Sequence, residues 1–481
     1  MSNQELEIEQ ADFKQDAEEV AKLATQESAL VEYVPKSKAP YRMNTLIPRN
    51  MAFEVQKSLN SIVKSKGNID NYVRNQLKYE STKQLWSGLG AEQVDAVGLY
   101  LKQFENEQGI IIADQTGIGK GRQAAAVIRH AVMNDYIPVF FTKKPDLFTD
   151  MYRDLKAIGF ENIRPFIVNT DTNAKIKDAD GNVVFSPLSS SAQADLISNE
   201  IEFPTESPES IEYHKKIGKK LPDPDKTRTI KIPLTLDHLP LGYDMIFATY
   251  SQVQSAHPYK RMWIEKMVNN GIDGSKKYKK LIFILDESHM AGGFDSIIGT
   301  WMREVLPQTK ACCFLSATFA KYPEVMPFYA KKTAIAETGL TDSNFVRSMT
   351  SGGLALQEIV ASNLSESGQL IRRQRSNEGV NVDYITLDAE PQRSKSRESV
   401  NRIISLMNDV VAFEQEFVAP LLADVHASAK AQGEHMSSKP RGLGVKQSPY
   451  FSRVFNIIDQ MLFALKVKDV VAHTIKLLKE D

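Results

Sequence analysis

The sequence predicts an α/β fold built on a parallel sheet, with a helical region before the sheet and another after it. The first indication is a series of short apolar runs, each followed by a turn or by a helix-like stretch. Apolar strands that alternate with amphipathic helices are typical of parallel sheets covered on both faces. The second indication is that apolar residues recur at helical spacing on either side of this series. The expected strands are GIIIAD, IPVFFT, IRPFIVN, YDMIFATY, KKLIFILDE and KACCFLSAT.

The composition is that of an ordinary globular protein. Of 481 residues, 42% are hydrophobic and 25% are charged, which excludes a mainly disordered, collagen-like or membrane-spanning chain. The formal net charge is −1, so binding to nucleic acid would have to use local patches. Cys312 and Cys313 are adjacent, which suits small packing residues in a reducing compartment better than a disulfide. No histidine or cysteine spacing predicts a zinc site.

Four regions are expected along the chain. Residues 1–40 are an acidic tail and an extended, proline-bearing connector, and residues 41–108 are a helical N-terminal region. Residues 109–345 form the sheet domain, which carries a surface insertion rich in Pro, Asp, Ser and Lys at 171–241. Residues 346–481 are mainly helical. The basic run RRQR at 372–375, inside this last region, is expected on a solvated face.

A glycine-rich stretch, ADQTGIGKG at 113–121, lies between an expected strand and an expected helix, as a phosphate-binding loop must. Glycines let backbone N–H groups approach the phosphates, the helix N-terminus favours an anion, and Lys120 adds a cation. The match to GxxxxGK[ST] is imperfect, because Asp114 replaces the first glycine and Gly121 replaces the residue that holds Mg²⁺. A glycine-rich turn without a ligand is the alternative. The predicted binding residues in this loop are Asp114, Gln115, Thr116, Gly117, Ile118, Gly119, Lys120, Gly121 and Arg122.

Two further motifs follow expected strands. LIFILDESH at 281–289 delivers two acids to the carboxyl end of a strand, where α/β sheets bind ligands. Asp286 would hold Mg²⁺ through water, and Glu287 would orient and deprotonate the attacking water; a polar strand cap is the alternative. Ser316 and Thr318 would relay between the nucleotide and a bound strand, or form a simple turn. The order of the three motifs predicts nucleotide binding more specifically than any one of them.

Together these motifs resemble the first RecA-like domain of a superfamily 2 helicase, which is a P-loop NTPase fold. More narrowly, DQTGIGKGR is similar to the phosphate loop of the strawberry notch family, where Gly-Lys-Gly-Arg stands in place of Gly-Lys-Thr. Such domains occur in large bacterial, phage and plasmid proteins, some fused to DNA methylases and some linked to protection from restriction. The resemblance covers roughly residues 33–480, without the insertion. It also includes AEQVDA (91–96), VFFTKKPDL (139–147), FATYSQ (247–252) and GQLIRRQ (368–374).

The resemblance implies ATP and Mg²⁺ as ligands. Lys120, Asp286 and Glu287 would be the catalytic residues. Gln93 would read the adenine edge; an exposed helix glutamine is the alternative. Because Gly121 has no hydroxyl, the metal ligand stays open between Asp286, acting through water, and Thr116.

The resemblance also implies DNA as a partner. Lys143, Lys144, Thr249 and Tyr250 would face a nucleic-acid backbone across the carboxyl ends of the strands, positioning it without reading its sequence. Solvated lysines are the alternative for the first two residues. His289 would couple the acidic motif to Ser316 or Thr318; a merely structural histidine is the alternative.

Motors of this superfamily close the ATP site with arginines from a second RecA-like domain, which are worth ~10³–10⁵ in rate. By the resemblance, this sequence ends at the helix before that domain, so a continuation of the chain or a partner would supply it. The expected function is the ATP-binding N-terminal half of a DNA helicase or translocase, with little hydrolysis alone. We expect it in the cytoplasm, or in the host cytoplasm or virion if phage-encoded, and not in a membrane. The alternative is a nucleotide-binding structural component of a phage assembly without turnover; a AAA+ protein is disfavoured by the Ser-Ala-Thr strand.

Overall fold

The fold is taken from a computed structural model, which divides the chain into two units, Met1–Glu378 and Gly379–Asp481. The expected acidic tail falls almost entirely in residues 1–29, which lie outside the described residues. The described residues are 30–216, 220–254, 258–269, 280–294, 296–319, 323–376 and 392–413, with a few more between 416 and 479.

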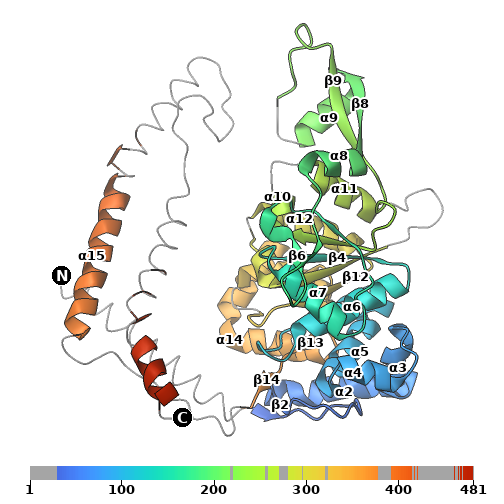
Figure 1. The fold of residues 1–481 in the computed structure, drawn as a ribbon, viewed down its shortest axis with the longest axis vertical. Coiled ribbons are helices and arrows are strands. Elements are labelled where there is room, and N and C mark those ends of the chain that lie inside the picture. The colour runs from blue at the N-terminus through green and yellow to red at the C-terminus, as the bar shows by residue number, and fades with distance from the viewer. Residues whose placement is uncertain are drawn as a thin grey trace. The chain divides into compact units, whose positions relative to one another are not determined.

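A central parallel sheet organises the first unit (Figure 1). As far as the chain is described, it has seven strands in the order β13-β3-β12-β11-β4-β10-β5, and every neighbouring pair is parallel. The strands are nearly all buried along their length, as in a sheet covered on both faces. This confirms the predicted α/β class. The strands are β3 (Gly109–Ile112), β4 (Ile137–Thr142), β5 (Pro165–Ile167), β10 (Met245–Thr249), β11 (Leu281–Asp286), β12 (Ala311–Leu315) and β13 (Leu370–Ile371).

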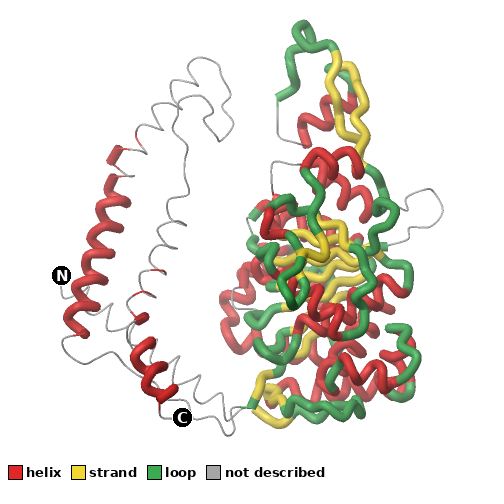
Figure 2. Tube along the Cα trace, in the orientation of Figure 1, coloured by secondary structure: helices red, strands yellow, loops and turns green. Residues whose placement is uncertain are grey.

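Helices precede the sheet and cover it, as Figure 2 shows in red around the yellow strands. The helical N-terminal extension comprises α2 (Arg49–Lys66), α3 (Ile69–Gln76), α4 (Thr82–Gly88) and α5 (Ala91–Glu105). Helix α5 packs on β3 and β12, and α6 packs on β4, β11 and β12. Later helices are α6 (Lys120–Met133), α7 (Leu147–Ala157), α10 (Tyr250–Gln254), α11 (Pro258–Asn269), α12 (Ile297–Val305), α13 (Met326–Ala330) and α14 (Asp342–Glu366).

The sheet extends beyond residue 345, where the sequence placed the end of the sheet domain. Strand β13 pairs with β3, and β14 (Gln374–Arg375) pairs with β2 (Thr45–Pro48), which in turn pairs with β1 (Leu30–Glu32). The connector expected to be extended therefore forms part of a small antiparallel sheet. Strands β13 and β14 are only two residues long each, so they leave almost no period in the sequence.

Between β5 and β10 the chain forms small antiparallel pairs outside the main sheet, in the stretch where an insertion was predicted. They are β6 (Ile176–Lys177) with β7 (Val183–Phe185), and β8 (Ser198–Pro204) with β9 (Thr229–Thr235), accompanied by α8 (Ser190–Ile197) and α9 (Pro208–Lys216). The pair labelled β8 and β9 stands apart from the sheet in Figure 1. In the second unit, α15 (Gln392–Phe413) is helical, as the sequence predicts. Among the described residues, no helix combines the length and the apolar character that crossing a membrane requires.

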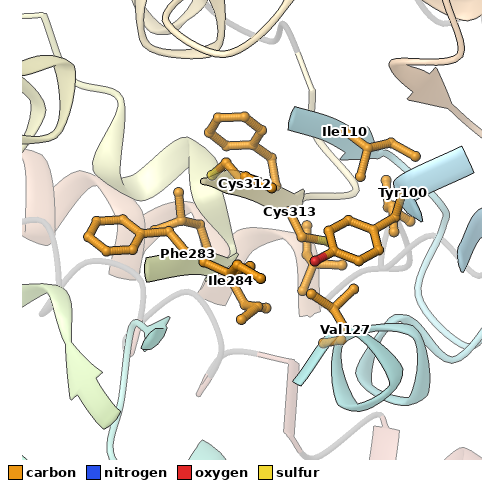
Figure 3. Close-up of a cluster of buried hydrophobic side chains, with 14 of the residues drawn as sticks. Tyr100, Ile110, Val127, Phe283, Ile284, Cys312 and Cys313 are labelled. Atoms are coloured by element: carbon orange, nitrogen blue, oxygen red, sulfur yellow. The ribbon is translucent and has the colours of Figure 1, made fainter. Parts of the chain in front are cut away.

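Cys312 and Cys313 lie in the middle of the sheet core on β12 (Figure 3). Phe283 and Ile284 lie beside them on β11, and Tyr100 of α5 lies in the same cluster. Both cysteines are fully buried, and burial raises the pKa of each thiol, so neither has the character of a reactive thiolate. They are packing residues, as expected.

His130 on α6 is a buried histidine that is expected to make the folded chain less stable at acid pH. The rings of Tyr100 and Phe104 pack edge-on against it, and its Nε2 has no hydrogen-bond partner among the described residues. Burial lowers the pKa of His130 from 6.5 to about 4, so the folded chain holds it neutral where the unfolded chain protonates it. Above pH 6.5 this histidine is neutral in both states and does not lower the free energy of unfolding. Between pH 6.5 and 4 the free energy of unfolding falls by about 3 kcal/mol, because the unfolded chain takes up a proton that the folded chain does not.

We therefore expect a His130→Gln variant to lose less stability on acidification than the wild type. Urea unfolding of both proteins at pH 7.5 and pH 4.5 measures this difference. Equal losses in the two proteins would contradict the role assigned to His130.

Candidate nucleotide site

The chain between β3 and α6 forms a tight loop, as the sequence predicts for a phosphate loop. Gly117 and Gly119 have φ angles of 92° and 82°, in the left-handed region that favours glycine. At Gly119 a Cβ would also lie 2.2 Å from Nε2 of Gln93, so a side chain there would displace the Gln93 amide. Helix α6 begins at Lys120, which places a helix N-terminus directly after the loop.

Lys120 lies between this loop and the acidic strand β11. Its Nζ donates a hydrogen bond of 2.7 Å to the main-chain oxygen of Asp114. Burial lowers the pKa of Lys120, while the carboxylates of Asp114, Glu287 and Asp286 act in the opposite direction. The lysine is thus within the electrostatic reach of both acids that the sequence singled out.

The two acids follow one another at the carboxyl end of β11. Asp286 accepts a hydrogen bond of 3.1 Å from Oγ1 of Thr142 on β4, and burial raises the pKa of its carboxyl. Glu287 has φ 46° and ψ 48°, a left-handed conformation that is uncommon for a residue with a side chain. Such a conformation costs of order 1–3 kcal/mol and is concentrated at functional sites. The chain therefore turns sharply at the residue expected to orient water.

These groups line one cavity of 650 Å³, a volume typical of small-molecule sites. Of the predicted binding residues, the cavity brings together Gln93, the loop from Thr116 to Arg122, and both acids. Sequence reasoning did not name its remaining lining residues, which come from the N-terminal region, α7 and β14. They are Tyr41, Met43, Trp86, Ser87, Gly88, Leu89, Gly90, Arg153, Asp154 and Arg375.

Gln93 is only 2% exposed, so it is not an exposed helix glutamine. Its Oε1 accepts a hydrogen bond from the Gly90 N–H at 3.0 Å. Its Nε2 donates to the main-chain oxygens of Ile118 and Gly119 at 3.1 and 3.3 Å. Gln93 therefore links the start of α5 to the phosphate loop, and its reading of adenine stays a prediction.

Asp114 and Gln115, which the sequence placed among the nucleotide-binding residues, are bonded within the protein and are not among the residues that line the cavity. The Asp114 carboxylate is fully buried and is bonded to Arg373 and to Nε2 of Gln123. Oε1 of Gln115 accepts a hydrogen bond from the Arg375 N–H. Their roles in nucleotide binding stay predictions, and a position in the loop does not fix the direction of its side chain.

Within the basic run 372–375, Arg372 and Arg375 are exposed as expected, but Arg373 is not. Its side chain is completely buried, and its guanidinium pairs with Asp114. The ion pair raises the pKa of Arg373, although burial alone would lower it. A buried charge without such a partner would be strongly unfavourable.

His289 lies where the sequence expected it to couple two motifs. Its Nδ1 is 2.8 Å from Oγ of Ser316 and 3.3 Å from Oγ1 of Thr318. It is also 3.5 Å from Oε2 of Glu287. The structure thus brings the acid, the histidine and the two hydroxyl residues into one connected group.

Thr249 and Tyr250, predicted to face a nucleic-acid backbone, are buried. Oγ1 of Thr249 is bonded within the protein to Asn169, and the Tyr250 hydroxyl donates to the main-chain oxygen of Asp286 at 2.7 Å. These two residues support the strand ends and do not form a binding surface. Lys143 and Lys144, in contrast, are exposed at the end of β4.

The oxygen donors in the cavity fit Mg²⁺, which prefers one or two carboxylates together with water and phosphate oxygens. Asp286 and Thr116 would hold it, since Gly121 supplies no hydroxyl. A Cβ at this glycine would lie 1.9 Å from Oδ2 of Asp154 on α7, so a side chain there would require the Asp154 carboxylate to move. No group of three or more His, Cys, Asp or Glu side chains that could hold a metal occurs in the described part of the chain.

The phosphate loop lies within a match to a known protein family. The family model described as "P-loop containing NTP hydrolase pore-1" matches residues 24–202, which include the phosphate loop. This unit has the P-loop NTPase fold. In this P-loop NTPase domain the acids and the Ser-Ala-Thr strand lie beyond the matched residues, so their placement rests on the structure itself.

Two solved structures from Sulfolobus solfataricus are also similar to this chain. One is a SWI2/SNF2 ATPase core in complex with dsDNA, with 14% identity and a TM-score of 0.34, covering 78% of this chain and 64% of that chain. The other is a SWI2/SNF2 ATPase core domain, also with 14% identity and a TM-score of 0.34, covering 66% of this chain and 51% of that one. The P-loop NTPase chain thus spans less than two thirds of the length of each. No curated protein matches its sequence.

Proposed function

We propose that this chain is the ATP-binding half of a superfamily 2 DNA helicase or translocase, of the strawberry notch kind. The observation that supports the proposal best is that Lys120, Asp286 and Glu287 line a single cavity with the phosphate loop. The group formed by His289, Ser316 and Thr318 adjoins Glu287 and would carry a signal to the strand ends.

In this proposal the loop N–H groups and Lys120 bind the phosphates of ATP. Glu287 accepts a proton from the attacking water and orients it. Mg²⁺, when bound, neutralises charge that develops on the phosphates. Asp286 is held in place by Thr142, and the Tyr250 hydroxyl supports the backbone at the same point. Arginines from a second lobe would complete the site, so we propose weak hydrolysis by this chain alone.

DNA is the proposed partner, and the exposed Lys143 and Lys144 are its proposed contacts. They follow β4, whose neighbour β11 carries the two acids, so bound DNA would lie close to the nucleotide. An assembly with phage proteins or with a linked methylase is the broader setting that the proposal allows.

The test is the salt dependence of DNA binding, measured by fluorescence anisotropy on a labelled duplex between 50 and 200 mM salt. Each phosphate contact contributes about −0.9 to the slope of log K against log salt. The Lys143→Ala/Lys144→Ala variant is therefore expected to make the slope shallower by about 2. The matched Lys64→Ala/Lys83→Ala variant removes two exposed lysines from α2 and α4 and should keep the wild-type slope. A flat response of the wild type would remove DNA from the proposal.

A further inference from the structure

Residues Gln369–Arg375, here called the strap, run alongside β3 and continue beside the phosphate loop. The hydrogen bonds of the parallel pairing between β3 and β13 do not stop where β3 ends. They recur at every second residue up to the loop itself, so the loop is an extension of the sheet on this side. The bonds run from Ile111 N to Gln369 O at 2.8 Å, from Ala113 N to Ile371 O at 2.7 Å, and from Gln115 N to Arg373 O at 2.8 Å.

The ion pair between Asp114 and Arg373 fixes the strap to the base of the loop. Nε of Arg373 donates to Oδ1 of Asp114 at 3.0 Å, and Nη2 donates to Oδ2 at 2.6 Å. The Arg373 backbone N–H also donates to Oδ1 at 3.0 Å. Both side chains are completely buried, and two-point geometry of this kind gives strong orientation.

The same guanidinium reaches the opposite side of the loop. Nη1 of Arg373 donates to the main-chain oxygen of Glu92 at 2.6 Å. Glu92 precedes Gln93, whose amide is bonded to Ile118 and Gly119 at the far side of the loop. Arg373 therefore connects the strap with the start of α5, and both of these segments are hydrogen-bonded to the phosphate loop.

Arg375 fastens the strap near the tip of the loop. Its backbone N–H donates to Oε1 of Gln115 at 3.1 Å, and its Nη2 donates to the main-chain oxygen of Gly117 at 2.8 Å. Strand β14, to which Arg375 belongs, is itself paired with β2. The tip of the loop is thus tied to a separate small sheet.

We propose that the strap sets the nucleotide-binding conformation of the phosphate loop, with Arg373 as its positioning residue. In the general loop motif the position of Asp114 is a glycine, which needs no partner. Without the guanidinium, the buried Asp114 carboxylate would have to turn toward water or take up a proton. Turning it would move the Asp114 main-chain oxygen, to which Nζ of Lys120 is bonded. The loss of Arg373 would therefore displace the groups that bind phosphate.

This inference rests on the proposed binding of nucleotide at the cavity. The test distinguishes a failure of nucleotide binding from a failure of the strap to position the loop. The first variant is Arg373→Lys, which keeps the charge and loses the two-point geometry. The matched control is Arg129→Lys, because Arg129 is also buried and donates to the main-chain oxygens of Leu77, Lys78 and Gly159, away from the loop. Affinity for ATP with Mg²⁺ is measured by isothermal titration, and amide hydrogen exchange of the nucleotide-free protein is measured over residues 115–121.

We expect Arg373→Lys to weaken ATP binding by about 10- to 100-fold and to speed exchange at residues 115–121. Arg129→Lys should keep the wild-type affinity and the wild-type exchange over the loop. Wild-type affinity and loop exchange in a folded Arg373→Lys protein would overturn the proposal. If the wild type itself binds no ATP, the proposed function fails, and loop exchange alone still decides whether the strap holds the loop.

If Arg373→Lys does not fold, a second variant at the exposed end of the strap tests the proposal. The variant Gln115→Ala/Arg375→Ala removes two exposed side chains and leaves the core intact. We expect it to speed exchange at the loop and to weaken ATP binding by about tenfold. Unchanged exchange and affinity in this variant would overturn the proposal.

Discussion

Replacing Lys120 with alanine is expected to weaken ATP binding by about 100-fold. The variant removes the cation at the start of α6 that lies within reach of both acids. Phosphate oxygens would then lose one of the cations that compensate their charge in the cavity. Isothermal titration with a non-hydrolysable ATP analogue and Mg²⁺ measures the effect, and urea unfolding verifies that the variant is folded.

Lys310→Ala is the matched control for this variant. Lys310 precedes β12 at the opposite end of the strands and pairs with Glu107 near the surface. Its removal changes the net charge by the same amount and should leave nucleotide affinity within about twofold, since surface pairs contribute little. Equal affinities of Lys120→Ala and the wild type would place the triphosphate elsewhere and remove the basis of the motor proposal.

All strands of the sheet except β13 were predictable from the sequence, together with the order of the motifs, because each is a short apolar run that ends in polar residues. Strand β11, for example, is apolar from Leu281 to Leu285 and then places Asp286 and Glu287 at its carboxyl end. Parallel strands bring such ends to one edge, so the meeting of the acids with Lys120 follows from the alternation of strands and helices.

The direction of side chains at that edge was not predictable in the same way. Thr249 and Tyr250 close β10 and begin a helix, and a motif that resembles a binding segment does not state which of its residues point inward. Their side chains are bonded to Asn169, which follows β5, and to the main-chain oxygen of Asp286 on β11. For this reason the sequence could not show that Thr249 and Tyr250 are buried, while Lys143 and Lys144 stay the predicted contacts with nucleic acid.

Arg373 was missed because its partner Asp114 lies 259 residues away. The one local signal was that the arginine follows Leu370 and Ile371, which are fully buried. Taken together with this apolar pair, Arg373 would be predicted to lie on a strand that enters the core. The charges of residues 372–375 alone predict a basic run on the surface.

Glu287→Gln is expected to separate binding from turnover. The amide has nearly the same size as the carboxylate but cannot accept the proton of the attacking water. The slow hydrolysis proposed for this chain should therefore fall by ~10²–10⁴, while affinity for ATP stays within about threefold of the wild type. Single-turnover hydrolysis of labelled ATP with the protein in excess measures the first quantity, and isothermal titration measures the second.

Glu107→Gln is a close control, because Glu107 also has a positive φ, of 55°, and lies outside the cavity before β3. It separates the loss of the catalytic carboxylate from any effect of an amide in the left-handed conformation. If Glu287→Gln lost affinity as severely as Lys120→Ala, Glu287 would act in binding and not as a base. If Glu287→Gln and Lys120→Ala both left a stable higher-order assembly intact and the wild type showed no hydrolysis, the structural alternative would replace the motor.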